Sequence, residues 1–333
     1  MTDLIDLGTR ILQSVGVPEP DARLVSDSLA TADRWGHPSH GMLRLPWYVA
    51  RIRSGAMRAV TRPRTVVDGG ATAVIDGDDG IGQVITHQAC REAVARAGDH
   101  GVAAVAVRNS NHFGTAAYWT RIMADAGCIG ILTTNGSPAM APTGGREKIV
   151  GANPWSIAAP RPDGHVVLDI ANTSVARGKI YAARERGEPI PDGWAVDADG
   201  LPTTDPQAAI DGVLAPMSGH KGYAISFMMD VLSGVLTGSS YAGDVAGPYV
   251  PDQRSGCGHL VIALRVGAFA DPAAFGQRLD DLIDVTKRVP LARNATEIFY
   301  PGEPENRRDI VTLTPKTLED LRALAHECGV DFD

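Results

Sequence analysis

The stretch Val102-Ala103-Ala104-Val105-Ala106-Val107-Arg108-Asn109-Ser110-Asn111-His112-Phe113-Gly114 changes character halfway along. Its apolar first part, 102–107, predicts a strand, whereas the small and amide-bearing residues at 109–114 favour a tight loop before a helical pattern that starts at Thr115. In open α/β sheets ligands collect just beyond the carboxyl ends of strands, and a histidine placed there can exchange protons near neutral pH. His112 is therefore a candidate functional residue. The alternative is a structural histidine whose ring nitrogens are held in a loop hydrogen-bond network.

The chain on both sides of this stretch alternates short strand-like runs with helical patterns. Alternation of this kind predicts an α/β sheet covered by helices on both faces. The helix expected at 221–236 is apolar nearly all round, which predicts burial in a core or at a subunit interface. The expected helices are 82–97, 115–126, 176–186, 221–236 and 272–287, and the expected strands include 66–67, 73–75, 102–107, 129–133, 155–159, 166–170 and 260–264.

Both ends of the chain are expected to be helical. Apolar residues recur at helical spacing in 3–16, and a second helix is expected over 21–33. Near the other end, Thr314-Pro315 is typical of a helix N-cap followed by proline at the first helical position. We therefore expect an α/β body over residues 66–285 and a helical unit formed jointly by residues 1–65 and 286–333.

Composition narrows the class of protein. The chain has 333 residues, 44% of them hydrophobic, which is enough for a sizeable core in one large domain or two modest ones. A net charge of −8 without basic runs argues against a nucleic-acid partner. We expect a cytoplasmic protein without a membrane segment, because no stretch resembles a signal peptide or reaches the roughly 18 apolar residues of a spanning helix. The four cysteines lie far apart and predict neither a disulfide framework nor a structural zinc site.

A second candidate site lies in residues 37–48, which read His-Pro-Ser-His-Gly-Met-Leu-Arg-Leu-Pro-Trp-Tyr. Ser39, His40 and Arg44 offer a hydroxyl, a proton-transfer group and a guanidinium that can grip a carboxylate through two parallel hydrogen bonds. Tyr48 shares a face with Arg44 if this part is helical, because the two are four residues apart. The structural alternative makes Ser39 a helix N-cap and leaves the arginine at the surface.

Glycine-rich turns, rather than the usual fingerprint, indicate where a nucleotide would bind. The chain has no GxGxxG motif, since Gly80-Ile81-Gly82 is followed by Ile85 where the third glycine should stand. Lys221 opens an expected helix, where a bound anion meets both the ammonium and the helix dipole, although a solvated surface lysine is the alternative. The turns whose backbone N–H groups suit phosphate are 142–145, 151–154, 219–222 and 301–303.

No metal site is expected. His37 and His40 are three residues apart, but Pro38 between them spoils a helical ligand pair. The chain contains no HExxH motif, and no acid–histidine spacing is typical of zinc.

Together these segments resemble the malate/L-lactate dehydrogenase family often called type 2, which also includes sulfolactate, ureidoglycolate, diketogulonate and piperideine-2-carboxylate enzymes. The resemblance covers nearly the whole chain, and its motifs occur in the family's order. They are Ser39-His40-Gly41 with Arg44 and Tyr48, Asn109 to Gly114, Ala141 to Gly145, Gly151 to Pro154, Leu168 to Lys179, Asp199 to Pro206, Gly219 to Gly222, and Pro301 to Glu303.

The resemblance implies an NAD(P)-dependent oxidoreductase with a three-layer, non-Rossmann cofactor domain around a mixed sheet. It also implies a homodimer with the active site near the subunit boundary. Ala152, Asn172 and Ala224-Ile225 depart from the family's usual residues, which concerns details of cofactor contact rather than the class. By residue match, His112 and His40 are proton-transfer residues; Ser39, Arg44 and Tyr48 contact substrate; and NAD or NADP contacts Asp169, Ile170, Ala171, Asn172, Thr173, Ser174, His220, Lys221, Gly302 and Glu303.

We therefore expect hydride transfer between nicotinamide and a small 2-hydroxy or 2-oxo acid, of the malate, lactate or sulfolactate kind. One histidine moves the hydroxyl proton while Arg44 holds the carboxylate. We favour His112 as the acid–base because it follows a strand, with His40 shaping or sharing the proton path. Two alternatives keep the fold: reduction of a cyclic imino acid, or of a sugar-derived keto acid. A third is a cofactor-binding protein without catalysis, which loss of the histidines or of Arg44 would favour. The substrate and the choice between NAD and NADP stay open.

Overall fold

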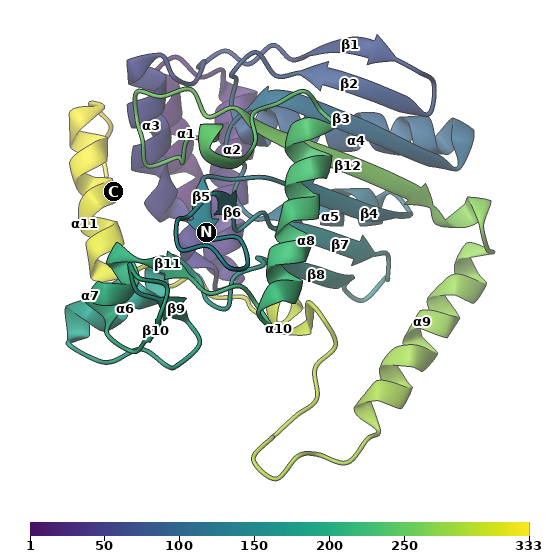
Figure 1. Ribbon diagram of the computed structural model, residues 1–333. Helices are drawn as coiled ribbons and strands as arrows, with labels where there is room; N and C mark the ends of the chain where they lie inside the picture. The colour runs from purple at the N-terminus through teal and green to yellow at the C-terminus, as the bar shows by residue number, and fades with distance from the viewer. Residues whose placement is uncertain (333) are drawn as a thin grey trace.

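A seven-stranded mixed sheet lies at the centre of the computed structural model, which describes residues 1–332 (Figure 1). The strand order is β1-β2-β3-β12-β4-β7-β8; β2 and β3 run parallel, and the other neighbouring pairs are antiparallel. The expected α/β class with a mixed sheet is confirmed. The strands are β1 (Arg64–Asp68), β2 (Thr72–Asp76), β3 (Val102–Ser110), β4 (Cys128–Thr134), β7 (Trp155–Ala159), β8 (Val166–Ile170) and β12 (Cys257–Arg265).

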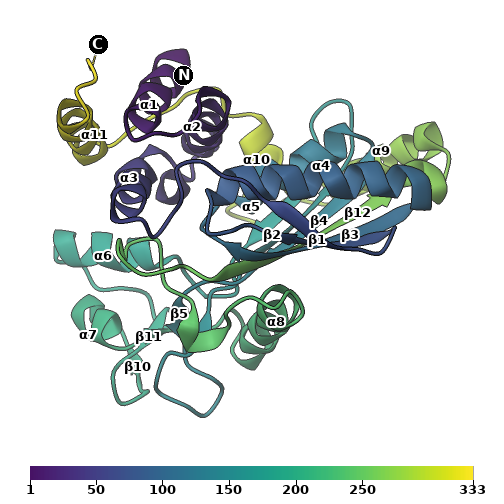
Figure 2. The same cartoon turned by 90° about the horizontal axis from the view of Figure 1, so that it is seen from above.

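Helices cover both faces of this sheet (Figure 2). On one face lie α4 (Gly82–His100) and α5 (Ala116–Asp125), and on the other lies α8 (His220–Asp230), which continues as a π-helical turn over Val231–Val235. The main apolar core fills the space between the sheet and the first pair of helices. Its buried residues include Ile75, Ile85, Val105, Trp119, Leu132 and Val261.

The N-terminal helices and the C-terminal helix pack together at one end of the sheet (Figure 2). They are α1 (Thr2–Ser14), α2 (Glu19–Arg34), α3 (Leu45–Ser54) and α11 (Pro315–Glu327), and they share a core that includes Leu12, Val25, Leu29, Leu45 and Leu321. The predicted start of the last helix is confirmed, because the Thr314 hydroxyl accepts a hydrogen bond from Thr317 N at 3.1 Å and Pro315 opens the helix.

The remaining elements form smaller pieces around the sheet. A small lobe holds α6 (Arg177–Arg186), α7 (Pro206–Asp211) and the short strands β9 (Ala195–Val196), β10 (Pro202–Thr203) and β11 (Val213–Leu214). The strands β5 (Pro138–Met140) and β6 (Val150–Gly151) pair with each other. Helix α9 (Pro272–Lys287) projects away from the sheet, and the short α10 (Glu303–Asn306) follows it (Figure 1).

The end of β3 differs from the prediction. The loop was expected at 109–114, but β3 continues to Ser110, which pairs with Cys257 of β12. The strand passes through Asn109 at φ +54°, beside a register shift in that pairing. A neighbouring strand from a distant part of the sequence thus extends β3 into residues whose local preference is for a turn. By contrast, the bounds of β7, β8 and α9 agree with those expected from their local patterns.

Helix α8 is oriented opposite to what its apolar sequence predicts for a core helix. Phe227 and Met228 are about half exposed, at 51% and 49%, whereas Ser226 and Asp230 are buried. The buried polar side chains have partners: Ser226 Oγ donates to Gly151 O at 2.7 Å, and Asp230 accepts from the Asn135 amide at 2.9 Å. The prediction that the apolar face of α8 is buried in the core of a single chain is therefore wrong, because these polar contacts turn that face outward.

Two further observations concern residues 1–332. No helix in this part of the chain combines the length and apolar character needed to cross a membrane. The same residues contain no cluster of three or more histidine, cysteine, aspartate or glutamate side chains placed to hold a metal ion.

Candidate active site

Two consecutive 3-10 turns, Pro38–His40 and Met42–Arg44, carry the second candidate segment into α3. Asp33, at the end of α2, fixes their junction because its Oδ2 accepts a hydrogen bond from Met42 N at 2.7 Å. Gly41 between the turns touches the same carboxylate so closely that an added Cβ would lie 2.1 Å from Asp33 Oδ1. A buried carboxyl and a residue without a side chain therefore set the path of this segment.

The two candidate histidines, far apart in sequence, are stacked on each other. The ring centroids of His40 and His112 lie 5.5 Å apart, and their planes differ by 18°. Ser39 Oγ lies 3.0 Å from Nδ1 of His40, and the Tyr48 hydroxyl lies 2.7 Å from Nδ1 of His112. The turns before α3, α3 itself and the loop after β3 thus meet in one cluster, which we call the histidine pair.

Both rings of the histidine pair are held neutral. Burial, with the nearby Arg44 and His37 charges, lowers the pKa of His40 to about 3, and burial together with His40 and Arg44 lowers the pKa of His112 well below its ordinary value. The backbone N of Gly114 also lies 3.3 Å from Nδ1 of His112. Tyr48 and Gly114 therefore both engage Nδ1 and leave Nε2 as the nitrogen open to a substrate.

Arg44 is placed to hold an anion beside this pair. Its Nε donates to Ser39 O at 2.5 Å, and its guanidinium stacks over the Trp47 ring at 4.1 Å from the centroid. Across residues 1–332, no carboxylate lies within 4.0 Å of this guanidinium. A partly buried guanidinium that is oriented but not neutralised suits a carboxylate ligand.

The strand directions bring a third candidate segment to the same edge of the sheet. The pairings Ser110–Cys257, His259–Thr134, Thr133–Trp155 and Trp155–Ile170 place the carboxyl ends of β3, β4 and β8 at one edge of the sheet, with the amino ends of β12 and β7 between them. Asp169, near the end of β8, accepts a hydrogen bond from Ala117 N at 2.7 Å. Since Ala117 lies in the first turn of α5, directly after the His112 loop, this contact joins the two segments.

The residues after β8 run beside 215–217. Ser174 N donates to Ala215 O at 2.8 Å, Met217 N donates to Asn172 O at 2.8 Å, and Thr173 pairs with Pro216. The buried Asn172 amide is already occupied, because it donates to Asn153 O at 2.7 Å and accepts from Trp155 Nε1 at 3.2 Å. The structure therefore brings segment 171–174 to the turn that leads into α8, with the Asn172 side chain serving the fold.

The start of α8 has the character of an anion site. Ser218 and Gly219 both have positive φ, and Gly219 is an N-cap without a side-chain hydrogen bond. His220 and Lys221 follow and are exposed. An uncapped helix N-terminus presents unsatisfied N–H groups and the positive end of the helix dipole, and the Lys221 ammonium adds a full charge. These features fit a dinucleotide pyrophosphate.

The Pro301-Gly302-Glu303 turn packs against β8. Pro301 O accepts from Val167 N at 2.9 Å, and an added Cβ at Gly302, whose φ is +86°, would lie 3.0 Å from the same nitrogen. The Glu303 carboxylate is engaged by Tyr300 N at 3.1 Å, by Arg307 at 2.6 Å and by Lys287. The backbone of this turn, rather than its carboxylate, is what remains for a ligand.

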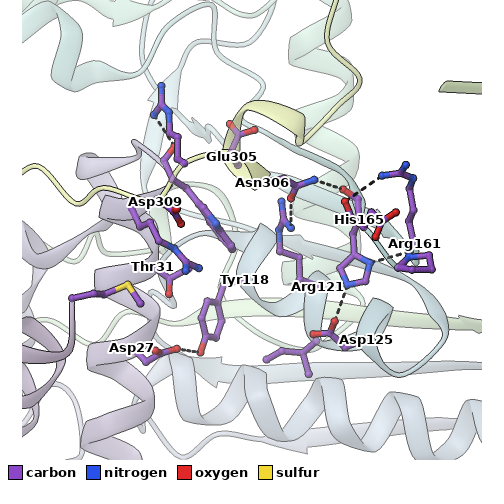
Figure 3. A pocket seen from close by; sticks show the side chains of 18 residues that line it. Asp27, Thr31, Tyr118, Arg121, Asp125, Arg161, His165, Glu305, Asn306 and Asp309 are labelled. Carbon is purple, nitrogen blue, oxygen red and sulfur yellow. Dashed lines mark hydrogen bonds and ion pairs between the residues drawn. The ribbon is translucent and has the colours of Figure 1, made fainter. Parts of the chain in front are cut away.

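A polar cavity of about 710 Å³ lies between α2, α5, the turn between β7 and β8, and residues 305–309 (Figure 3). Arg34, Arg121 and His165 are among the side chains that line it, but the histidine pair and Arg44 are not. His37 lies between the cavity and that pair: its Nε2 is 3.3 Å from Oε1 of Glu305, and its backbone O accepts a hydrogen bond from His40 N at 2.9 Å. Because Glu305 belongs to α10, the cavity also adjoins the Gly302–Glu303 turn.

His259 is a buried histidine beside the loop after β3 that was not predicted from the sequence as a site residue. His259 of β12 is fully buried, with Nδ1 2.8 Å from Thr134 Oγ1 and Nε2 2.8 Å from Ser110 Oγ. The Phe113 ring packs edge-on against it, with centroids 4.7 Å apart. The expected strand began at residue 260, three positions after the observed start at Cys257, and the correct start would have placed His259 within the strand.

The family follows from comparison with known proteins. The family model described as malate/L-lactate dehydrogenase matches residues 1–314. The chain belongs to this family. L-sulfolactate dehydrogenase of Methanocaldococcus jannaschii is 38% identical over 328 residues, which cover 97% of this chain and 95% of that protein. The solved structure of sulfolactate dehydrogenase from the same organism has a TM-score of 0.93, with 38% identity and coverage of 99% of this chain and 97% of that chain.

The names of two further relatives of this family member carry different cofactors. (2R)-3-sulfolactate dehydrogenase (NADP(+)) of Chromohalobacter salexigens is 34% identical over 326 residues, covering 96% of this chain and 95% of that protein. Ureidoglycolate dehydrogenase (NAD(+)) of Escherichia coli is 35% identical over 298 residues, covering 89% and 84%. Both forms of the nicotinamide cofactor therefore occur among relatives of similar identity.

Proposed function

We propose that this protein is an NAD(P)-dependent dehydrogenase that transfers hydride between nicotinamide and a small 2-hydroxy or 2-oxo acid. The observation that carries this function is the stacked histidine pair beside Arg44, a guanidinium with no carboxylate partner in the described residues. Membership of the malate/L-lactate dehydrogenase family supports the reaction class. The substrate is a carboxylate because a partly buried arginine without a counterion favours an anionic ligand.

His112 is assigned the proton transfer. Nε2 of His112 faces the substrate while Tyr48 holds Nδ1. In oxidation Nε2 of the neutral ring takes the hydroxyl proton, which makes the ring an imidazolium whose second proton, on Nδ1, donates to the Tyr48 oxygen. In reduction the ring starts as this imidazolium, gives the Nε2 proton to the 2-oxo group and is left neutral. A positioned general acid–base of this kind contributes roughly 10²–10⁴ in rate. His40, stacked on the same ring, shapes or shares the proton path, and Ser39 holds its Nδ1.

Arg44 is assigned the substrate carboxylate. Its Nε donates a hydrogen bond to Ser39 O and its planar group stacks on the Trp47 ring, so the guanidinium is oriented before the substrate arrives. A hydrogen bond to a charged group contributes roughly 1.5–3 kcal/mol. Tyr48 and Ser39 border the same space and are assigned substrate contacts together with Arg44.

The cofactor is NAD or NADP, whose oxidised form accepts the hydride and whose reduced form donates it. The start of α8, with His220 and Lys221, is assigned the pyrophosphate, which its uncapped N–H groups and ammonium suit. The backbones of the Gly302–Glu303 turn and of the segment Asp169 to Ser174 are assigned the rest of the dinucleotide. The cavity beside Glu305 offers room for its far end.

The finer architecture is also proposed. The cofactor domain comprises residues 66–285 and is of a non-Rossmann type, consistent with the missing glycine fingerprint. Residues 1–65 and 286–333 form the helical domain, which the shared core of α1, α2, α3 and α11 supports. The protein works as a cytoplasmic homodimer with the active site near the subunit boundary, and the exposed apolar face of α8 is its proposed contact.

The function is tested by measuring oxidation of NADH and of NADPH with a substrate panel. The panel holds pyruvate, oxaloacetate, sulfopyruvate, a sugar-derived keto acid and the cyclic imino acid piperideine-2-carboxylate. Faster reduction of a 2-oxo acid than of the imino acid is expected. Preference for the imino acid would change the reaction class, and no oxidation with any compound would remove the function.

The assignment of the proton donor is tested separately with His112→Gln and His40→Gln. We expect the His112 variant to lose most of its turnover and the His40 variant to keep more. If His112→Gln keeps wild-type turnover while His40→Gln loses it, the two roles are reversed.

A further inference from the structure

Arg51, one turn after Tyr48 in α3, is a buried arginine without a carboxylate partner. Its side chain is 1% exposed, and no carboxylate of residues 1–332 lies within 4.0 Å of it. Nη2 donates to Asn111 Oδ1 at 3.0 Å and to Gln253 O at 2.8 Å, and Nη1 donates to Val250 O. Burying a charge is costly unless it is hydrogen-bonded, so three neutral acceptors in this place indicate a specific task.

The first partner, Asn111, lies between the end of β3 and His112. Its amide Nδ2 donates to Asp79 O at 3.1 Å and to Gly80 O at 2.8 Å, while its Oδ1 accepts from Arg51. The backbone is equally constrained, because an added Cβ on Gly82 at the start of α4 would lie 2.2 Å from Asn111 O. Asn111, the residue next to His112, is thus fixed by contacts with residues 79–80, with Gly82 and with Arg51. Of these contacts, the one with Arg51 comes from α3.

The other two partners belong to residues 247–253, which we call the strap. Ser54 of α3 also donates to the strap, through Pro251 O. Within the strap, the Tyr249 ring packs edge-on against Trp47, with centroids 6.0 Å apart. Trp47 is the ring on which the Arg44 guanidinium stacks. The strap therefore covers the side of α3 that holds the carboxylate-binding arginine, and Arg51 anchors it from within.

The geometry points to Arg51 as a positioning residue that ties the His112 loop and the strap to α3, and so sets the distance between His112 and Arg44. Arg44, Tyr48 and Arg51 are spaced by four and three residues, which places them on one face of the helix. Tyr48 holds the ring of His112, whereas Arg51 holds the backbone beside it through Asn111. This inference rests on the proposed function, since it concerns how the same site is held in its reactive geometry.

The test begins with steady-state kinetics on Arg51→Met, using NADH or NADPH and the panel compound that wild type reduces fastest. A misplaced reacting group can cost roughly 100-fold, so kcat is expected to fall about 10- to 100-fold while the KM for the cofactor stays near wild type. Arg51→Lys keeps the charge but reaches fewer acceptors, and is expected to restore part of kcat. The matched control is Arg53→Met on the same helix, an exposed arginine that pairs with Glu327 and should keep wild-type kcat.

A double-mutant cycle separates positioning through Asn111 from a general loss of packing. If Arg51 acts through that contact, the double variant Arg51→Met with Asn111→Ala is no slower than the worse single variant. Multiplying losses, or wild-type kcat in Arg51→Met, would overturn the inference. If Arg51→Met does not fold, Arg51→Lys and Asn111→Ala decide: kcat losses without a loss in thermal stability support positioning, and unchanged kcat in both contradicts it.

A readout without substrate tests the strap directly. Trypsin cuts after Arg254, which directly follows the strap and pairs with Asp79 at 2.7 Å. Arg51→Met should raise the rate of cleavage between Arg254 and Ser255, followed by mass spectrometry, and Arg53→Met should not. Equal rates in wild type and Arg51→Met would refute the anchoring role. If wild type oxidises neither cofactor with any panel compound, the proposed function fails, and this comparison still decides whether Arg51 holds the strap.

Discussion

The hydroxyl of Tyr48 lies 2.7 Å from Nδ1 of His112, which joins α3 to the loop after β3. The contact fixes the orientation of the ring and leaves Nε2 for the reaction. It also makes the position of the His112 ring depend on a helix outside the α/β sheet, because Tyr48 belongs to the core shared by α1, α2, α3 and α11.

Tyr48→Phe removes this hydrogen bond and keeps the ring. A typical hydrogen bond contributes about 0.5–1.5 kcal/mol, so kcat is expected to fall roughly 2- to 12-fold. Steady-state kinetics with the best panel compound measures this loss, and thermal denaturation should show little change. Wild-type kcat in this variant would show that Tyr48 does not orient His112.

Arg44→Met should act on substrate binding. Losing a charged hydrogen bond of roughly 1.5–3 kcal/mol lowers kcat/KM for a 2-oxo acid about 10- to 150-fold, whereas the KM for NADH should change little. Arg44→Lys should recover only part, because an ammonium cannot reproduce both the bond to Ser39 O and the stack on Trp47. An effect confined to cofactor binding would argue that Arg44 serves the dinucleotide.

His259 should make stability depend on pH. Burial lowers its pKa to about 3, from an ordinary value of 6.5. Below pH 6.5 the unfolded chain binds a proton at this residue that the folded chain does not, so the stability contributed by His259 falls as pH falls toward 3. The slope is about 1.4 kcal/mol per pH unit, or about 2 kcal/mol between pH 6.5 and pH 5.

The measurement for His259 compares wild type with His259→Gln by denaturant unfolding at several pH values. Burial raises the pKa of Asp33 to about 6, and that carboxyl gives the opposite dependence, so only the difference between the two proteins is informative. Wild type should be more stable at pH 7.5, and its advantage should shrink toward pH 5. An advantage that stays constant with pH would contradict a neutral His259.

Gly41→Ala should disturb the turn that carries His40. The added Cβ meets the Asp33 carboxylate at 2.1 Å, and overpacking of this kind costs about 1–3 kcal/mol. We expect a lower melting temperature and a lower kcat/KM. Gly276→Ala in α9 is the matched control, because nothing lies within 4 Å of its added Cβ and the change should be neutral or slightly stabilising. Equal behaviour of the two variants would rule out a steric role for Gly41.

Phe227→Glu should break the proposed dimer. The side chain is 51% exposed on the apolar face of α8, and a buried unpaired carboxylate at an interface is costly. Sedimentation velocity should show a dimer for wild type and a monomer for the variant. Ile310→Glu, at an apolar residue that is 79% exposed and follows α10, should remain dimeric. Helices α10 and α8 lie on opposite faces of the sheet (Figure 2). A dimeric Phe227→Glu would place the interface elsewhere.

Local sequence patterns correctly predicted the elements whose bounds do not depend on contacts with distant parts of the chain. The strands 155–159 and 166–170 and the helix 272–287 have the expected bounds, because their alternation, caps and periodicity are all local. The end of β3 and the orientation of α8 were not predictable in this way. The first depends on Cys257, and the second on Asn135 and Gly151, all distant in sequence.

The candidate site shows the same division. The spacing in 37–48 groups Ser39, Arg44 and Tyr48 without any knowledge of the fold. Nothing in that spacing brings His112 to His40, and only the family resemblance implied that both belong to one site. The contacts of Arg51 and His259 were missed because their partners come from three separate segments, and a buried arginine in a helix otherwise resembles a surface residue.

Strand β12 lies between β3 and β4 but comes from residues 257–265. On the ribosome, the sheet consequently remains in two halves until most of the chain has been made, with the edges of β3 and β4 both unpaired. Late closure of the sheet slows folding and leaves unpaired strand edges that can pair with other chains. The nascent protein should therefore depend on chaperones more than its size alone suggests.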